Sequence, residues 1–413
     1  METDSILKQD QENKQEIGNA DLVVGILGEF EPDGVAAVCD ALRTVSGSPR
    51  IAILHDGPAP NVSNSAAPEG SASLFFVPSP LATPEAPGGS LLSVMAAYQS
   101  VFVASEKLGA RGCCVIASQI EAPPLQWVRQ LAEPLLDRDV DLVVPHYARH
   151  KFEGLLNGSI ISPFVRSLYG KRIYNPMGPD LGISRRLFSK MLGAELRAGG
   201  GGIHPLASLA PMAACSNLEV CEVHVGARVY PPTDWMNISS LLARVLDPVF
   251  VDMERNAPCW QRIRGSVPVT AIGEPIFVSQ DTGSVDIQRM VESFQLGNRE
   301  LQEIWSLVLP PATLFELRKL LRLPPEQFHM DDALWVRIVY DFALAHRLRT
   351  ISRDHLLKSM TPLYLGWAAS YAREIQTAGA LALVQRLERL ALAYESGKPY
   401  LVSRWRWPDR FSP

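Results

Sequence analysis

The sequence predicts an α/β protein with a parallel, doubly wound sheet domain and a helical C-terminal extension. Short apolar runs alternate with segments of helical spacing in the first half of the chain, a pattern typical of parallel strands joined by helices. After residue 237 only the helical spacing continues. A chain of 413 residues is also long for a single core. We therefore expect a disordered lead at 1–20, a sheet domain at 21–236 and a helical domain at 237–413.

Continuous apolar runs mark the expected strands, because a strand buried on both faces carries apolar residues without alternation. Five such runs occupy 21–28, 50–54, 74–77, 112–117 and 141–145. Helical spacing predicts the segments that cover the sheet, at 35–45, 91–108 and 125–136, and a further helix at 155–168. In the second half of the chain we expect helices at 238–255, 286–307, 312–321, 331–347, 353–375 and 378–396.

The charge and the apolar content exclude several classes of function. The net charge is −5, so the whole chain lacks the positive field of a nucleic-acid-binding protein. Residues 1–20 contain no apolar stretch, and no apolar run approaches the ~20 residues that cross a bilayer. The six cysteines include no CxxC pair, so the spacing of a zinc site is absent. We expect a cytoplasmic protein.

A cationic loop follows the last expected strand. Ligands of doubly wound sheets bind at the carboxyl ends of the strands, and Arg149, His150 and Lys151 come directly after such an end. Arginine and lysine neutralise phosphate and carboxylate groups, the arginine through a bidentate fork. Asn157 and Tyr169 lie on the helix expected next and complete a candidate set that binds an acceptor or a phosphate. The alternative is a solvated loop without a ligand.

A glycine-rich turn separates this helix from the next one. Asp180 stands between Gly178 and Gly182, and glycines permit a close approach of the backbone. The Asp180 carboxylate either holds a sugar hydroxyl or closes the turn. Ser184 is a suitable N-cap for the helix that follows. At the C-terminus, 403–407 (SRWRW) either stacks on a ligand through its aromatic rings or docks on the body of the protein.

Three stretches between His146 and Ser184 form the longest distinctive pattern in the chain. They are 147–154 (YARHKFEG), 168–173 (LYGKRI) and 176–184 (PMGPDLGIS). This pattern resembles a group of bacterial family 2-type glycosyltransferases, which includes relatives of mannosylglycerate synthase and glucosyl-3-phosphoglycerate synthase. The resemblance extends over about 21–255 and, more weakly, into the helical part at 328–335 (FHMDDALW).

The resemblance implies a GT-A fold, the fold of nucleotide-diphospho-sugar transferases. It also implies a hexosyltransferase activity that moves a sugar from a nucleotide-sugar donor to a small acceptor. Asp56 matches the family's acidic residue after the second strand, near the nucleotide, and Phe30-Glu31 matches the family's aromatic-Asn-Glu motif in part. Ser118 and Gln119 occupy the donor side at the end of the fourth strand.

Two residues are the candidate catalytic groups that the resemblance suggests. Asp180 lies in the most specific stretch of the pattern, as described above. His204 aligns with an aspartate near the acceptor of the mannosylglycerate relative, and its alternative role is structural.

The metal side of the site departs from the family pattern. The family's fourth strand ends in Asp-x-Asp, whose carboxylates hold Mg²⁺ or Mn²⁺ against the sugar diphosphate, but this sequence reads Ala117-Ser118-Gln119 there. Gly88-Gly89-Ser90 lacks the lysine of a phosphate-facing motif, and the family's histidine ligand falls near Val229 or Tyr230. We therefore assign no metal ligand and no certain cofactor.

Two functions remain open. In the first, the chain is an active glycosyltransferase in which Arg149, Lys151 or Arg228 neutralises the leaving diphosphate without a metal. In the second, it is a non-catalytic member of the family, a pseudoenzyme that binds or regulates. The first predicts nucleotide binding with sugar turnover, and the second predicts binding without transfer. The resemblance also suggests a homo-oligomer formed through the helical extension.

Overall fold

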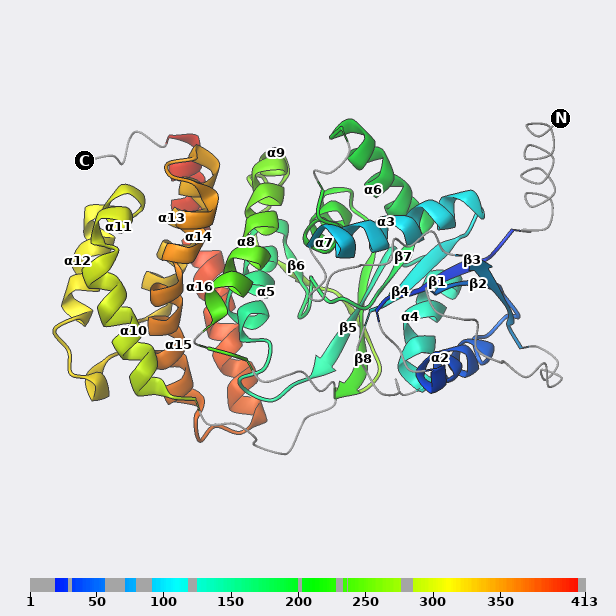
Figure 1. Cartoon of the computed structure of the whole chain (residues 1–413), viewed down its shortest axis with the longest axis horizontal. Coiled ribbons are helices and arrows are strands. Elements are labelled where there is room, and N and C mark those ends of the chain that lie inside the picture. The colour runs from blue at the N-terminus through cyan, green and yellow to red at the C-terminus, as the bar shows by residue number, and fades with distance from the viewer. Residues whose placement is uncertain are drawn as a thin grey trace. The chain divides into compact units, whose positions relative to one another are not determined.

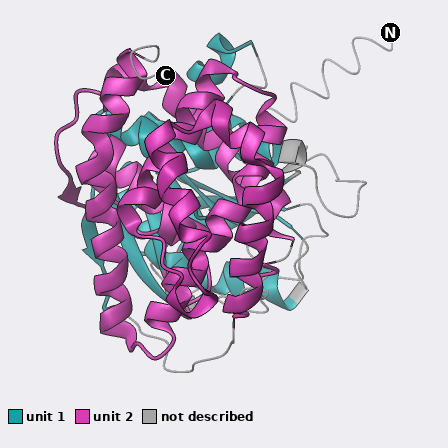
Figure 2. Cartoon of the chain, turned by 90° about the vertical axis from the view of Figure 1, so that its left-hand side faces the viewer, with its two compact units in different colours: residues 1–146, 178–225, 270–274 teal, residues 147–177, 226–269, 275–413 magenta. Residues whose placement is uncertain are grey.

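The computed structural model describes residues 19–28, 32–55, 71–78, 91–117, 125–199, 203–227, 233–235, 237–275 and 285–407. The chain forms two compact units, coloured separately in Figure 2. Unit 1 comprises 1–146, 178–225 and 270–274, and unit 2 comprises 147–177, 226–269 and 275–413. Each unit is thus assembled from separate stretches of the chain.

Unit 1 is built on a sheet of eight strands in the order β10-β8-β5-β7-β4-β1-β2-β3. Parallel pairing joins β1 to β2 and β4, β2 to β3, and β8 to β10. The predicted α/β class, a sheet domain with a helical C-terminal part, is confirmed. The strands are β1 (Leu22–Ile26), β2 (Arg50–His55), β3 (Ser73–Pro78), β4 (Gly112–Ile116), β5 (Leu142–Ala148), β7 (Leu181–Ser184), β8 (Val220–Ala227) and β10 (Thr270–Ile272).

The expectation of an all-parallel sheet is wrong at one strand. β7 runs antiparallel to both β4 and β5 and places Gly182 opposite Cys114 and Val143. A β-carbon on Gly182 would lie 2.7 Å from the carbonyl oxygen of Leu131, so only glycine fits between the sheet and the helix behind it. Because β7 has only four residues and follows a turn, its sequence reads as part of a loop.

Helices cover both faces of this sheet (Figure 1). One face carries α3, α6 and α7, and the other carries α2 and α4. Ser184 caps α6 as predicted, because its hydroxyl accepts a hydrogen bond from the Leu187 N–H at 3.3 Å. The helices are α2 (Pro32–Arg43), α3 (Leu91–Lys107), α4 (Leu125–Asp137), α6 (Arg185–Arg197) and α7 (Pro205–Cys215).

Unit 2 is mostly helical. The predicted helices at 286–307 and 353–375 are each divided in two. The second is divided because a new helix starts at Thr361, with Pro362 in its first turn. The elements are η1 (Asn157–Ile161), α5 (Ser162–Tyr169), β6 (Lys171–Arg172), α8 (Ile238–Arg255), α9 (Ala257–Trp260), β9 (Val267–Pro268), α10 (Ile287–Glu300), α11 (Gln302–Val308), α12 (Pro311–Leu320), η2 (Pro325–Gln327), α13 (Asp332–Leu348), α14 (Arg353–Ser359), α15 (Thr361–Ile375) and α16 (Ala380–Arg406).

Aromatic side chains form the core of unit 2. Trp367 stacks on Trp335 and Tyr371, with ring centroids 5.6 and 5.3 Å apart. The C-terminal SRWRW segment belongs to the end of α16, where buried Trp405 meets Trp260 edge to face at 5.3 Å. The predicted alternative in which this tail docks on the protein is therefore confirmed. No helix in the described part of the chain has the length and apolar content needed to cross a membrane.

Candidate functional site

The cationic loop that follows β5 lies in unit 2 and leads directly into η1. η1 is a single turn of π-helix, a conformation that often occurs at functional sites. Gly154 has a left-handed φ of +60°, and a β-carbon there would lie 2.0 Å from Nη1 of Arg149. The glycine therefore makes room for the Arg149 guanidinium.

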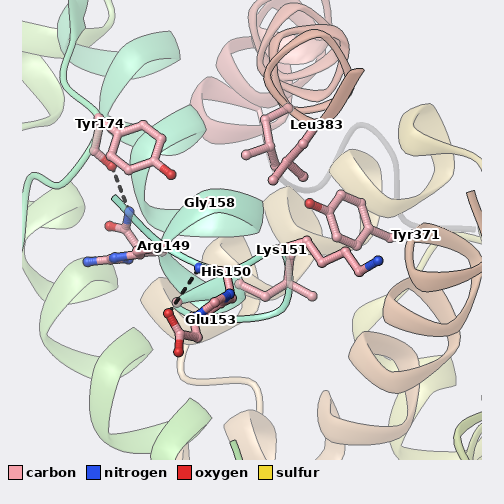
Figure 3. A pocket seen from close by; sticks show the side chains of 12 residues that line it. Arg149, His150, Lys151, Glu153, Gly158, Tyr174, Tyr371 and Leu383 are labelled. Atoms are coloured by element: carbon pink, nitrogen blue, oxygen red, sulfur yellow. Dashed lines mark hydrogen bonds between the residues drawn. The ribbon is translucent and has the colours of Figure 1, made fainter. Parts of the chain in front are cut away.

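This loop forms one side of a hollow within unit 2 (Figure 3). α15 and α16 contribute Tyr371, Leu383 and Leu387 from positions more than 200 residues later in the sequence. The space that a water molecule can enter is about 20 Å³, which is the room of about one water-sized group. The lining residues are Arg149, His150, Lys151, Glu153, Gly154, Leu155, Asn157, Gly158, Tyr174, Tyr371, Leu383 and Leu387.

The charges around the hollow favour an anion. Arg149 and Lys151 both line it, and Lys151 extends toward Tyr371 in Figure 3. The Lys151 ammonium donates a hydrogen bond to the carbonyl oxygen of Gln376 at 2.5 Å. The one carboxylate in the lining, Glu153, accepts a hydrogen bond from the His150 N–H at 3.0 Å. The lining thus carries two permanent cations, Arg149 and Lys151, and one carboxylate, Glu153.

Asn157 presents a buried acceptor at the hollow. Its Nδ2 donates to the carbonyl oxygen of Tyr174 at 2.6 Å, which fixes the orientation of the amide (Figure 3). Its Oδ1 is buried and accepts no hydrogen bond from the part of the chain that the structure describes. A buried acceptor without a donor is costly, so a hydroxyl or N–H that reached this oxygen would stabilise it.

The structure brings Arg149, His150, Lys151 and Asn157 together as the sequence predicts, but it places Tyr169 elsewhere. Tyr169 is buried in the core of unit 2, and its hydroxyl donates to the Asp252 carboxylate at 3.0 Å. Burial and the neighbouring Asp252 charge raise its pKa. The side chain was expected beside the cationic loop because both follow the same strand. The intervening helix instead turns it toward α8.

Tyr174, Tyr371, Leu383 and Leu387 were not predicted to take part in a site. Tyr174 lies between the second and third stretches of the distinctive sequence pattern, so its place in the sequence could have suggested it. The other three belong to helices whose sequences read as ordinary packing residues, so no signal in the sequence links them to the loop.

Asp180 lies in unit 1, at the carboxyl end of β4. Its Oδ1 accepts a hydrogen bond from the Ala117 N–H at 2.8 Å, and the residue is fully buried at 0% exposure. The hydroxyl of Tyr98 donates to the adjacent carbonyl of Pro179. These contacts agree with the alternative in which Asp180 closes the turn, because a fully buried carboxylate is not presented to a sugar.

His204 also lies in unit 1, where it is the N-cap of α7. Its Nδ1 accepts a hydrogen bond from the Ala207 N–H at 3.4 Å. Burial lowers the pKa of His204, and the neutral ring keeps the lone pair that the cap requires. The geometry thus gives His204 a structural role as the N-cap of α7.

The remaining donor-side candidates lie outside the described residues. These are Phe30, Glu31, Asp56, Ser118 and Gln119, together with Gly88-Gly89-Ser90, Arg228, Val229 and Tyr230.

The residues at the end of β4 do not fit the metal that the family resemblance implies. Ala117-Ser118-Gln119 supplies no carboxylate, and the Asp180 carboxylate beside it is buried against Ala117. Hard divalent cations prefer carboxylate oxygens. Among the described residues, no group of three or more His, Cys, Asp or Glu side chains is arranged to hold a metal ion. The residues at the end of β4 therefore do not suit a divalent metal ion.

The fold and the hollow define an α/β protein with a helical unit that carries a candidate anion-binding site. No family model matches the chain, and no curated protein matches it either. The chain is similar to solved structures of glucosyl-3-phosphoglycerate synthase from Mycobacterium tuberculosis. The one with Mn²⁺, UDP-glucose and phosphoglyceric acid has 17% identity and a TM-score of 0.33, over 58% of this chain and 80% of that chain.

Two further structures are similar to the same degree. The same synthase with Mn²⁺, UDP and phosphoglyceric acid has 17% identity and a TM-score of 0.34, over 59% of this chain and 82% of that chain. A mycobacterial protein has 18% identity and a TM-score of 0.33, over 57% of this chain and 74% of that chain. At such low identity and TM-score, the function of the chain has to be judged on its own residues.

Proposed function

We propose that this chain is a GT-A-type glycosyltransferase that transfers a sugar from a nucleotide-sugar donor to a small anionic acceptor. The hollow beside Arg149 and Lys151 is the acceptor site in this proposal. The observation that carries it is the convergence of Arg149, Lys151 and Asn157 on one hollow, because all three lie between His146 and Ser184, the segment whose pattern resembles family 2-type glycosyltransferases. Two cations and a buried amide acceptor suit a phosphate or carboxylate that also carries a hydroxyl.

The sheet of unit 1 is the donor domain in this proposal. The carboxyl ends of its parallel strands are the usual place for a nucleotide, and Asp56 follows β2 there in the sequence. Without a carboxylate pair at Ala117-Ser118-Gln119, a leaving diphosphate would be stabilised by arginine or lysine.

The second candidate is a pseudoenzyme that keeps the acceptor site and does not transfer sugar. Its specific support is the same Ala117-Ser118-Gln119 stretch, together with the burial of Asp180 against Ala117. Both candidates predict an anion in the hollow. They differ in whether a nucleotide-sugar is consumed.

The test combines a thermal-shift measurement with a turnover assay. The full chain is heated with UDP, GDP, UDP-glucose and GDP-mannose, with and without Mn²⁺, and a binding ligand raises the midpoint according to its concentration over Kd. Turnover is followed as nucleoside diphosphate released in the presence of phosphoglyceric acid. A shift with release supports the transferase. A shift without release supports the pseudoenzyme, and the absence of any shift by a nucleotide contradicts the donor site.

A further inference from the structure

The hollow is too small to enclose a complete acceptor molecule. Its water-accessible space of about 20 Å³ takes about one water-sized group. A ligand that inserts the leading oxygens of an anionic group beside Arg149 and Lys151 therefore leaves the rest of itself on the neighbouring surface. The chemistry of that surface selects the class of ligand.

The neighbouring surface on the α16 side is apolar. The first turn of α16, residues 380–384, reads Ala-Leu-Ala-Leu-Val, and Leu381 and Val384 are 71% and 53% exposed. Leu383 lies in the same turn and Leu387 one turn later, and both line the hollow. Exposed apolar side chains scattered singly are ordinary, but a contiguous group of them often marks a binding surface.

The apolar turn and the cationic loop belong to one continuous surface of unit 2. Leu387 packs over η1, since a β-carbon on Gly158 would lie 3.5 Å from its Cδ2. Lys151 is tied to Gln376, the residue that follows α15, and Gly379 precedes α16. Gln376, which accepts the hydrogen bond from Lys151, therefore lies only a few residues before the apolar first turn of α16.

We propose that this surface binds an amphiphilic anion, a phosphate attached to an apolar chain. The phosphate group of the ligand lies at Arg149 and Lys151. Its apolar chain lies along Leu383, Leu387 and the exposed first turn of α16. This inference rests on the proposed function, whose acceptor it assigns to a class. A fully hydrophilic acid would make no use of Leu381 and Val384, and a wholly apolar ligand would make no use of the two cations that line the hollow.

The test is a calorimetric titration of the full chain with three phosphates below their micelle concentrations: glycerol 3-phosphate, butyl phosphate and octyl phosphate. If the alkyl group of the ligand lies on the first turn of α16, the affinity of the protein for the phosphate rises about twofold to fourfold for each methylene that the surface covers. The double variant Leu381→Ser/Val384→Ser removes most of this rise and leaves the affinity for glycerol 3-phosphate unchanged. Leu392→Ser is the matched control, because Leu392 is an exposed leucine of the same helix, 46% exposed and outside the hollow.

Each outcome has a separate meaning. Equal affinity for glycerol 3-phosphate and octyl phosphate overturns the inference and leaves the proposed acceptor site intact. If no nucleotide raises the unfolding midpoint in the thermal-shift test, the proposed transferase activity is overturned. The dependence of affinity on the alkyl length of the phosphates would still support the amphiphilic ligand. Vesicles of phosphatidylcholine and phosphatidylglycerol supply the same chemistry from a bilayer. If these vesicles sediment the protein while dissolved octyl phosphate does not bind, the inference of a single-molecule site is overturned in favour of membrane docking.

Discussion

The Arg149 guanidinium occupies the space that a β-carbon on Gly154 would need, with only 2.0 Å between that position and Nη1. The contact and the left-handed φ of +60° both explain why residue 154 is a glycine. It also makes the position of the candidate phosphate-binding arginine depend on the size of one neighbouring residue.

Gly154→Ala should therefore displace Arg149 and weaken anion binding by about tenfold, the loss expected for one misplaced charge-assisted hydrogen bond. Gly265→Ala is the matched control, because Gly265 has a similar φ of +70° but open space around its β-carbon position. Both variants carry the backbone cost of a left-handed alanine, about 1 kcal/mol. Calorimetry with phosphoglyceric acid checks the prediction, and equal affinities in the two variants would refute it.

Asn157→Ala should weaken the same ligand by about tenfold, because it removes the buried Oδ1 acceptor at the hollow. Asn256→Ala is the control. Asn256 also donates through Nδ2, at 3.0 Å to Asp252, but it does not line the hollow. Both variants should lose some unfolding free energy, and only Asn157→Ala should lose affinity. If Asn157→Ala binds phosphoglyceric acid as tightly as the unchanged protein does, the Asn157 amide does not contact this ligand.

Asp141→Asn should lower the unfolding free energy of the chain by about 2 kcal/mol, because the amide cannot satisfy all the donors that converge on this buried carboxylate. The fully buried Asp141 carboxylate accepts hydrogen bonds from the Ser184 hydroxyl at 2.5 Å, from Nε of Arg186 at 2.8 Å and from the Glu219 N–H at 3.0 Å. Urea unfolding provides the measurement. Asp139→Asn is the control, since this carboxylate is 85% exposed although it also contacts Arg186 at 2.9 Å, and it should cost below about 1 kcal/mol.

His204→Ser should flatten the pH dependence of stability. Burial lowers the pKa of His204 below its ordinary 6.5, so the unfolded chain binds more protons than the folded chain near that pH. The contribution of His204 is therefore complete above pH 6.5 and is lost as the pH falls through 6.5 toward the lowered value. Serine keeps the N-cap without titrating.

Urea unfolding at about pH 7.5 and about pH 5.5 compares the two proteins. The unchanged chain should lose more unfolding free energy on acidification than His204→Ser. If both proteins lose the same unfolding free energy on acidification, His204 is not the cause of the pH dependence. Retained turnover in His204→Ser would agree with the capping role, whereas a loss of turnover without a loss of stability would return His204 to the catalytic group.

The sheet strands and most helices follow from local pattern, whereas the site follows from contacts between distant segments. The buried run of β4 and the helix α8 were predictable because each carries its own apolar pattern and its own ends. β7 was not, since its four residues become a strand only between β4 and β5. Arg149 and Lys151 were predictable from their place after a strand, but Tyr371 and Leu383 meet them only through tertiary packing.

The central claim is that the hollow beside Arg149 binds the anionic group of the acceptor. The most direct measurement is a calorimetric titration of phosphoglyceric acid into the full chain and into Arg149→Ala. Arg185→Ala serves as control, because Arg185 is 53% exposed and its ion pair with Glu106 is a surface one. The account predicts a Kd about 10- to 100-fold weaker in Arg149→Ala and an unchanged Kd in Arg185→Ala. Equal Kd values in all three proteins would contradict it.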